Sequence, residues 1–245
     1  MNLFWAAFLG LIQGITEFLP VSSSGHLVIV QSLIPNFNQP GVFFDVVLHL
    51  ATLFAVVYFF RKRIFLLGQK YFILLIVGTI PAALIGYLFQ SQLENMFGGI
   101  NTVGIELIIT GFLNLLVDKS VATSKTISIK NSFLVGIAQA IAIIPGISRS
   151  GATIFAGVKL GISRKEIAEF SFLLSVPAIL GANILQFITH GVGGDLPIIY
   201  YIVGFLAAFI SGFISINFTL KALISKRFKW FAYYAFALGT VAIFL

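Results

Sequence analysis

The amino-acid sequence predicts an all-α polytopic membrane protein. It is an inverted-topology repeat, each repeat being one re-entrant helical hairpin plus three transmembrane helices. Three observations carry this prediction: an apolar composition, a motif that occurs twice, and basic residues grouped in a few loops. Hydrophobic residues make up 59% of the 245 residues, charged residues 9%, and the mean hydropathy is +1.05. A soluble domain carries about 25% charged residues, so the composition places this chain in a membrane.

The composition also excludes several classes of protein. Long apolar segments between short polar loops indicate helices, because a barrel would show alternating strands of about ten residues. The absence of cysteine excludes disulfides and thiolate metal sites. The net charge of +7 is explained by basic loops that set membrane topology, so we expect no nucleic-acid partner. The first helix has no basic n-region, and we therefore expect no cleavable signal peptide.

A duplicated motif is the most informative feature of the chain. Residues 10–26, GLIQGITEFLPVSSSGH, recur in altered form at 136–151 as GIAQAIAIIPGISRSG, with a constant offset of 126 residues. Each copy runs an apolar stretch into a proline and then a Ser/Gly cluster. The ionizable residues differ, because Glu17 and His26 occur only in the first copy and Arg149 only in the second. This divergence suggests one composite site built from two halves.

The basic residues predict the topology. Apart from Arg149 in the second motif copy, they fall in four groups, which are Arg61, Lys62, Arg63 and Lys70; Lys119, Lys125 and Lys130; Lys159, Arg164 and Lys165; and Lys221, Lys226, Arg227 and Lys229. By the positive-inside rule, these four loops are cytoplasmic. The connections 90–101 and 190–197 contain no Lys or Arg, so we expect them on the external side.

The elements then follow in order. In sequence they are a hairpin at 2–34, spans at 44–60, 71–89 and 100–117, a second hairpin at 131–160, and spans at 167–189, 198–220 and 230–245. The second hairpin starts and ends beside cytoplasmic groups, so it must enter and leave on the same side, with a break at Pro145-Gly146. The first hairpin is broken at Pro20. It enters from outside, because the next span must run inward to reach Arg61.

The whole chain is predicted to be a single integral membrane domain, 1–245, with repeat one at 1–120 and repeat two at 130–245. Three spans reverse the polarity, so the repeats are related by inversion, and the offset of 126 also relates Gly78 to Gly204. Inverted repeats with broken helices place a polar site where the broken ends meet. The alternative is eight ordinary spans with accidental similarity, although one full crossing at the second hairpin would leave a basic group outside.

In the first hairpin, Gln13 and Glu17 are four residues apart and share a helix face. An ionizable group at membrane depth is costly, so Glu17 is a functional-site candidate, unless the hairpin is shallow and Glu17 faces water. Ser22, Ser23 and Ser24 follow the break. They serve either simply as helix caps or as part of an anion site at a half-helix N-terminus. His26 is a structural group, or an acid, a base or a phosphate donor.

The second hairpin repeats this arrangement of a break followed by serines, with Ser148 as the predicted cap. Arg149 lies in the break and needs an anion, which is either Glu17 or a ligand phosphate. Thr153 lies on the same face and adds a hydroxyl. Two opposed half-helix N-termini, a guanidinium and several hydroxyls point to a phosphate or diphosphate, and Glu, His and Ser supply a base and a nucleophile. The apolar surroundings imply a lipid-linked phosphate.

These motifs resemble those of a known family. QGITE at 13–17, PVSSSGH at 20–26 and PGISRSGAT at 145–153 are similar to the signatures of the undecaprenyl-diphosphatase family of bacitracin-resistance proteins (UppP/BacA). The resemblance extends to LHLATLFAV and FSFLLSVPAILGA, which follow the two hairpins. It implies hydrolysis of undecaprenyl diphosphate to the monophosphate, which recycles the carrier lipid for peptidoglycan synthesis and confers bacitracin resistance. It also implies a bacterial plasma membrane location.

The motifs and the resemblance together predict the site residues. The predicted catalytic residues are Glu17, Ser23, His26 and Arg149. The predicted substrate-binding residues are Gln13, Ser22, Ser24, Ser148, Ser150 and Thr153. The family's first motif position can be Glu or Gln, and here it is Gln13, so this motif supplies a single carboxylate, Glu17. The family is stimulated by divalent cations. We therefore expect an Mg or Ca ion held largely by substrate phosphates, with Glu17 as the protein's metal ligand.

Several alternatives stay open at this point. Either Ser23 attacks phosphorus and water resolves the phosphoserine, or water attacks directly. The active site is expected to face the outer or periplasmic side, with the polyprenyl chain entering laterally between spans. A lipid flippase or secondary transporter is the rival function. A homodimer is an open expectation. An interfacial role is predicted for Asp45 and His49, with a place at the external mouth as the alternative.

Overall fold

The computed structural model describes residues 1–34, 43–96, 99–121, 123, 125–190 and 196–245. Over these residues the chain is helical, apart from turns and an isolated bridge between Lys125 and Ile162. The helices are α1 (Leu3–Phe18), α2 (Ser23–Leu33), α3 (Phe43–Phe59), α4 (Arg61–Phe65), α5 (Gln69–Leu88), α6 (Gln90–Met96), α7 (Ile100–Lys119), α8 (Ile129–Ile141), α9 (Arg149–Lys159), α10 (Arg164–His190), α11 (Ile198–Ile224) and α12 (Phe228–Ile243). The all-α prediction is confirmed.

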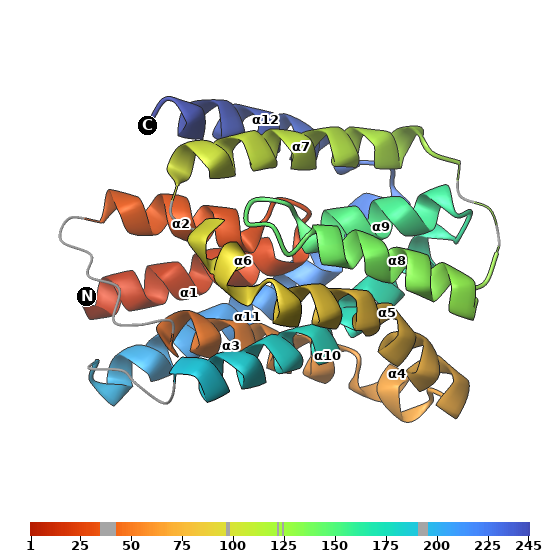
Figure 1. Cartoon of the computed structure of the whole chain (residues 1–245), viewed down its shortest axis with the longest axis horizontal. Coiled ribbons are helices and arrows are strands. Elements are labelled where there is room, and N and C mark those ends of the chain that lie inside the picture. Colours follow the sequence, from red (N-terminus) through yellow and green to blue (C-terminus); the bar gives the residue numbers. More distant parts are fainter. Residues whose placement is uncertain (35–42, 97–98, 122, 124, 191–195) are drawn as a thin grey trace.

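The helices are those of a multi-pass membrane protein. Within the described residues, α5, α7, α10 and α11 are long and apolar enough to cross a bilayer. The other two predicted spans, 44–60 and 230–245, correspond to α3 and α12, which are apolar helices of 17 and 16 residues. About 17 residues is the lower end of the range that spans the hydrocarbon core. Figure 1 shows the long helices running roughly along the longest axis of the molecule.

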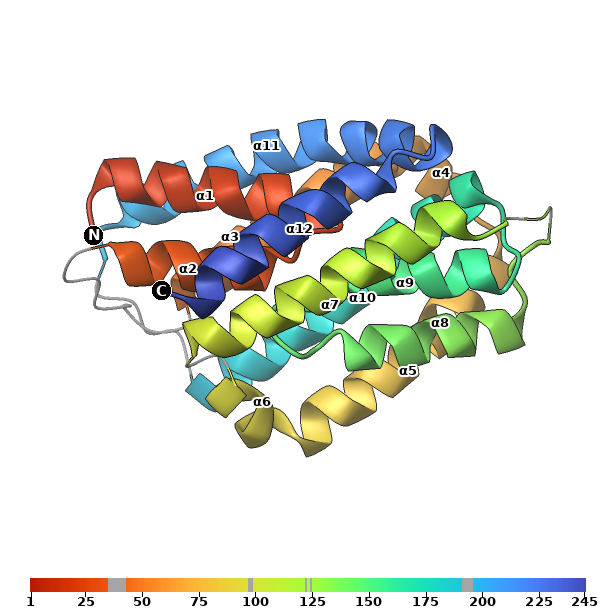
Figure 2. The same cartoon turned by 90° about the horizontal axis from the view of Figure 1, so that it is seen from above.

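Two expected loops contain short helices. The basic segment after α3 forms α4, and the expected external connection 90–101 begins with α6. Part of that connection, 97–98, and part of the connection 190–197, at 191–195, lie outside the described residues. The segments that carry the basic groups are α4, the start of α8, the α9–α10 connection and the α11–α12 turn. They lie at the end of the molecule opposite the N-terminus (Figures 1 and 2).

Each predicted hairpin is a pair of half-helices joined by a break. The first consists of α1 and α2 with a break at 19–22, and the second of α8 and α9 with a break at 142–148. The breaks predicted at Pro20 and Pro145-Gly146 are therefore confirmed. In Figures 1 and 2 the first hairpin extends from the end that carries the N-terminus and the second from the opposite end, so their tips approach each other in the middle.

Glycines let the hairpins approach the spans closely. α1 packs along α11, and α8 packs along α5. A Cβ added at Gly10 would lie 2.3 Å from the carbonyl oxygen of Gly204, and one added at Gly136 would lie 2.4 Å from that of Gly78. Both distances are shorter than any real carbon–oxygen contact, so no larger residue fits at either crossing without a shift of the helices.

A single helix, α7, holds both breaks. Asn114 Nδ2 donates to the carbonyl oxygen of Pro20 at 2.6 Å, and Thr110 Oγ1 donates to that of Gly146 at 2.9 Å. Thr110 Oγ1 also accepts from the backbone N–H of Ser148 at 2.9 Å. Backbone groups freed by a break at membrane depth need such partners. The polar face of α7 therefore fixes the two tips relative to each other.

Candidate active site

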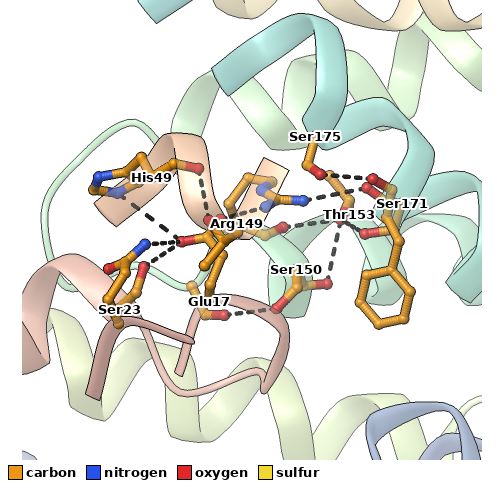
Figure 3. A network of polar contacts seen from close by, with 12 residues as sticks. Glu17, Ser23, His49, Arg149, Ser150, Thr153, Ser171 and Ser175 are labelled. Carbon is orange, nitrogen blue, oxygen red and sulfur yellow. Dashed lines mark hydrogen bonds and ion pairs between the residues drawn. The ribbon is translucent and has the colours of Figure 1, made fainter. Parts of the chain in front are cut away.

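Glu17, in the last turn of α1, is the centre of the polar cluster between the two hairpin tips (Figure 3). Its Oε1 accepts a hydrogen bond from Arg149 Nη2 at 2.6 Å. Its Oε2 accepts from Ser23 Oγ at 2.7 Å and from Gln13 Nε2 at 3.1 Å. The carboxylate is buried, and an ion pair with additional hydrogen bonds is the arrangement that makes such a buried charge tolerable. The two halves of the duplicated motif thus meet at one carboxylate.

The local fold explains why these side chains converge. Gln13 and Glu17 lie one turn apart on α1, and the break at Pro20 turns the chain back so that Ser23 begins α2 beside them. Ser23 and Arg149 are both the first residue of a half-helix, and they are related by the offset of 126. The duplication therefore carries a hydroxyl and a guanidinium to equivalent positions, and both reach Glu17.

The predicted caps are confirmed. Ser22 and Ser148 are the N-cap residues of α2 and α9, and each side chain accepts from the backbone N–H three residues on. Ser22 has φ of +68°, a conformation that costs energy for a residue with a Cβ. Ser24 Oγ lies 3.3 Å from Ser22 Oγ, and Ser150 Oγ lies 3.2 Å from Ser148 Oγ. The two tips thus share the same serine cap and the same contact between hydroxyls, although the backbone at the cap differs, with φ of −68° at Ser148.

Hydroxyl groups continue the cluster on the far side of Arg149. Arg149 Nη1 donates to the carbonyl oxygen of Ser171 at 3.2 Å. Thr153 Oγ1 lies 2.6 Å from Ser171 Oγ and 2.9 Å from the carbonyl oxygen of Arg149, to which it donates. Ser150 Oγ donates to the carbonyl oxygen of Leu19 at 3.2 Å and so ties the second tip to the first break. These contacts hold the guanidinium on the side that faces Glu17 (Figure 3).

His26 lies apart from the groups that contact Glu17. Its Nδ1 is 2.6 Å from the carbonyl oxygen of Ser22, and its Nε2 is 2.7 Å from the hydroxyl of Tyr234 on α12. The two rings are stacked with centroids 5.6 Å apart. Both ring nitrogens are therefore engaged, and the catalytic role predicted for His26 stays a prediction.

Two site residues were missed by sequence reasoning. His49 Nε2 lies 4.0 Å from Glu17 Oε2, although only an interfacial or external-mouth role was predicted for it. Ser171 contacts both Arg149 and Thr153, and no role was predicted for it. A signal was present, because the offset of 126 relates His49 to Ser175 and Asp45 to Ser171. The duplicated stretch after each hairpin therefore lines the site from both sides.

The described residues contain no group of three or more His, Cys, Asp or Glu side chains that could hold a metal ion. Both oxygens of Glu17 already accept hydrogen bonds from protein donors, and one of them is paired with Arg149. Gln13 Oε1 is buried without a hydrogen-bond partner, but one neutral oxygen does not make a cation site. These contacts do not fit a protein metal site at Glu17.

Chemically, the cluster combines a carboxylate, a hydroxyl that donates to it, and a guanidinium paired with it. A hydroxyl bound to a carboxylate can be deprotonated as it attacks. A guanidinium matches the oxygens of a phosphate bidentately. Of the two anions predicted as partners of Arg149, the structure shows Glu17. A phosphate that enters the site would compete with Glu17 for the same donors.

Comparison with known proteins agrees with the motifs. Residues 6–241 match the family model described as Bacitracin resistance protein BacA. A protein named undecaprenyl-diphosphatase from Carboxydothermus hydrogenoformans is 41% identical, covering 100% of this chain and 98% of that protein. Undecaprenyl-diphosphatase 4 of Bacillus thuringiensis (strain Al Hakam) is 42% identical with the same coverage. The undecaprenyl-diphosphatase of Methanococcus vannielii is 39% identical, covering 96% of this chain and 97% of that protein. Because the family match spans nearly the whole chain and these relatives align from end to end, this chain belongs to the BacA family of bacitracin resistance proteins.

Proposed function

We propose that this chain is an integral membrane phosphatase that hydrolyses undecaprenyl diphosphate to undecaprenyl phosphate and phosphate. The observation that carries the proposal is the junction at Glu17, where Ser23 Oγ at 2.7 Å and Arg149 Nη2 at 2.6 Å bind one buried carboxylate. The relatives that align over their whole length are named undecaprenyl-diphosphatase. The proposed substrate therefore agrees with the chemistry of the cluster.

In the proposed reaction, the Arg149 guanidinium releases the Glu17 carboxylate and binds the terminal phosphate of the substrate. The N-termini of α2 and α9 add their dipoles to the same anion. Ser23 Oγ attacks the terminal phosphorus and passes its proton to Glu17 Oε2. The bond to the bridging oxygen breaks, and its electron pair leaves on the prenyl phosphate. Water then cleaves the phosphoserine and returns a proton to Ser23.

Direct attack by water, with Glu17 as the base and Ser23 as a hydrogen-bond donor, needs the same groups. The two routes differ in one observable, which is a phosphoserine at Ser23. Rapid quenching with labelled substrate traps it only on the covalent route. If Ser23→Ala keeps most of the activity, the covalent route is excluded.

Gln13, Ser22, Ser24, Ser148, Ser150 and Thr153 act as substrate-binding or tip-shaping residues in this proposal. We propose that His26 positions the tip of the first hairpin, since its ring is held between the Ser22 carbonyl and Tyr234. We propose that any divalent cation enters the site bound to the substrate. The diphosphate oxygens supply the ligands for Mg²⁺ or Ca²⁺ that the chain does not.

The proposed architecture is an inverted repeat, supported by paired contacts. α1 packs on α11 as α8 packs on α5, and the glycine crossings, Gly10 on Gly204 and Gly136 on Gly78, are related by the offset of 126. All side chains of the cluster come from one chain. The proposed activity therefore needs no second copy, and a homodimer stays a prediction.

We further propose that the site opens to the outer or periplasmic side of a plasma membrane, with the prenyl chain entering laterally between helices. The segments that carry the basic groups lie at one end of the molecule, as a cytoplasmic face requires (Figure 2). A cysteine placed at Ser24 should react with a membrane-impermeant reagent added outside. Labelling from the cytoplasmic side only would contradict this orientation.

The decisive test of the function is phosphate release. The purified chain in detergent, with no membrane gradient, should liberate phosphate from undecaprenyl diphosphate, and Glu17→Gln should abolish this release. A lipid flippase or transporter has no need for a hydroxyl and base beside the guanidinium, and it would release no phosphate under these conditions. Absence of release from the well-folded wild-type chain would overturn the proposed function.

A further inference from the structure

His49 is a second histidine that reaches the Glu17 cluster, and it comes from a helix outside the two hairpins. It lies on α3, and its Nε2 is 4.0 Å from Glu17 Oε2 (Figure 3). We infer that His49 carries the proton of each turnover from Glu17 to the outside of the site. This inference rests on the proposed phosphatase function and assigns a proton route to that same site.

The hydrogen bond of the other ring nitrogen sets the tautomer of His49. Its Nδ1 lies 2.8 Å from the backbone carbonyl oxygen of Asp45, one turn earlier on α3. A carbonyl oxygen only accepts, so Nδ1 carries a hydrogen and donates it. In the neutral ring, Nε2 then has a free lone pair, and this is the atom that faces Glu17. The ring is therefore oriented to take a proton from the carboxylate side.

The proposed reaction leaves one proton on Glu17. On the covalent route, Ser23 gives its proton to Glu17, and the water that later cleaves the phosphoserine supplies one proton to Ser23 and its hydroxyl to phosphorus. On the direct route, the attacking water gives its proton to Glu17 and its hydroxyl to phosphorus. Both routes end with prenyl phosphate, hydrogen phosphate and a protonated Glu17. The next cycle cannot begin until that proton leaves.

Burial makes this removal a specific problem for the protein. The Glu17 side chain is 7% exposed, whereas that of His49 is 29% exposed. His49 therefore connects a buried acid with the accessible side of the cluster. The separation of 4.0 Å is longer than a hydrogen bond, so transfer requires one bridging water or a small rotation of the ring. Catalytic contacts are often this long before substrate binds.

The other imidazole and the hydroxyl groups around the cluster already have hydrogen-bond partners. Both nitrogens of His26 are hydrogen bonded at a distance from Glu17. Thr153 and Ser171 bond to each other. The charged groups that face His49 are Glu17 from α1 and, through Glu17, Arg149 from α9. The Asp45 carboxylate on α3 accepts from Gln31 of α2 at 3.0 Å. His49 is thus the imidazole placed to relay this proton.

The test is steady-state phosphate release by the full chain in detergent, with undecaprenyl diphosphate as substrate. His49→Ala should lower kcat by roughly 10- to 100-fold and change KM by less than about threefold, as expected for a group that moves a proton. Added imidazole should restore much of the lost kcat in His49→Ala, since the side chain is partly exposed. The same imidazole should leave Glu17→Gln inactive and the wild type unchanged.

His49→Gln separates a proton carrier from a structural hydrogen bond. Its amide is close to the imidazole in size and can donate to the Asp45 carbonyl, but it cannot carry a proton. It should be about as slow as His49→Ala, and it provides the kcat test if His49→Ala does not fold. Phe54→Leu, which changes an exposed residue of the same helix, is the matched control and should keep wild-type kcat.

Two results would overturn the inference. One is a His49→Ala chain with wild-type kcat. The other is a loss that imidazole does not repair and that His49→Gln does repair, because this pattern indicates a purely structural role. In both cases wild-type phosphate release would still stand, so the proposed function would survive. A wild-type chain that releases no phosphate would instead remove both.

Discussion

Equivalent positions in the two hairpins carry different side chains, and the difference makes the site. Ser23 and Arg149 each begin a half-helix directly after a serine cap, and both bind Glu17. With two serines the cluster would lack a cation, and with two arginines it would lack a hydroxyl next to the carboxylate. The divergence seen in the sequence therefore corresponds to a division of labour around one carboxylate.

Two substitutions of Arg149 should distinguish the effect of its positive charge from that of its planar guanidinium. We expect Arg149→Ala to lower kcat/KM for phosphate release by roughly 100- to 1,000-fold, since in the proposed reaction it removes the guanidinium that binds the terminal phosphate. Arg149→Lys keeps the charge but loses the planar fork, so it should recover only part of this loss. Lys159→Ala, at the other end of α9, is the control and should retain wild-type kinetics. Equal activity of all three variants would contradict the assignment of Arg149.

The same substitution should also change stability. Arg149→Ala leaves the buried Glu17 unpaired, which typically costs about 3–5 kcal/mol. The double variant Glu17→Gln/Arg149→Met should recover most of the thermal stability while remaining inactive. Thermal unfolding in detergent measures the first effect and phosphate release the second. Recovery of activity in the double variant would show that the ion pair is structural only.

The hydroxyl of Thr153 should matter more than its methyl group. It donates to the Arg149 carbonyl oxygen and contacts Ser171 Oγ at 2.6 Å. Thr153→Val removes the hydroxyl with little change of shape and leaves buried partners unsatisfied, at a cost of about 1–3 kcal/mol in stability. It should lower kcat by roughly tenfold, which is about 1.4 kcal/mol in the barrier. Thr153→Ser keeps the hydroxyl and should remain close to wild type. Similar losses in both variants would point to packing instead.

At the scale of elements, the half-helix tips depend on α7 for their position. Asn114 and Thr110 hold the carbonyl oxygens of Pro20 and Gly146, one in each break. A helix outside both hairpins thus sets the distance between Ser23 and Arg149. Sequence patterns offered no hint of this role, because Thr110 and Asn114 are unremarkable polar residues within an apolar span.

Asn114→Leu should therefore impair the site from outside it. The substitution removes the donor to the Pro20 carbonyl at the first tip, so we expect a loss of about 1–3 kcal/mol in stability. We also expect a clear loss of kcat, because Glu17 and Ser23 flank that tip. Thr102→Val, at the exposed start of α7, is the control. Normal phosphate release by a destabilised Asn114→Leu chain would show that the tip tolerates movement.

The close crossings make a second prediction for elements. Gly136→Ala places a Cβ 2.4 Å from the Gly78 carbonyl oxygen, so α8 and α5 must separate, at a typical cost of about 1–3 kcal/mol. Gly181→Ala is a matched control on α10, since nothing lies within 4 Å of the added Cβ. Thermal unfolding should show a lower midpoint for the first variant and an equal or higher one for the second. Equal midpoints would mean that the helices separate at no cost.

At the scale of the whole molecule, the site exists only when both halves are present. Glu17 and Ser23 lie in the segment 1–120, and Arg149 and Thr153 lie in 130–245. We expect neither half to release phosphate when expressed alone. Co-expression of the two should restore measurable activity, because α1 packs on α11 and α8 on α5 across the halves. Phosphate release by either half alone would contradict a composite site.

The sequence by itself determined the membrane class, the helical content, both breaks, the serine caps and the family. The helices, breaks and caps follow from local composition and proline positions, which act over a few residues, and the family follows from the motifs themselves. The convergence of Glu17, Ser23 and Arg149 could also be predicted from the sequence, because a duplication whose copies differ in their charged residues points to one shared site.

Only the tertiary structure decided which histidine joins the cluster. His26 is close to Ser23 in sequence, yet it points to Tyr234, whereas His49 reaches Glu17 from α3. The direction of a side chain depends on the rotation of its helix against its neighbours, and that rotation is set by packing across the whole bundle. The same is true of α7, whose hold on both breaks depends on contacts between residues far apart in the chain.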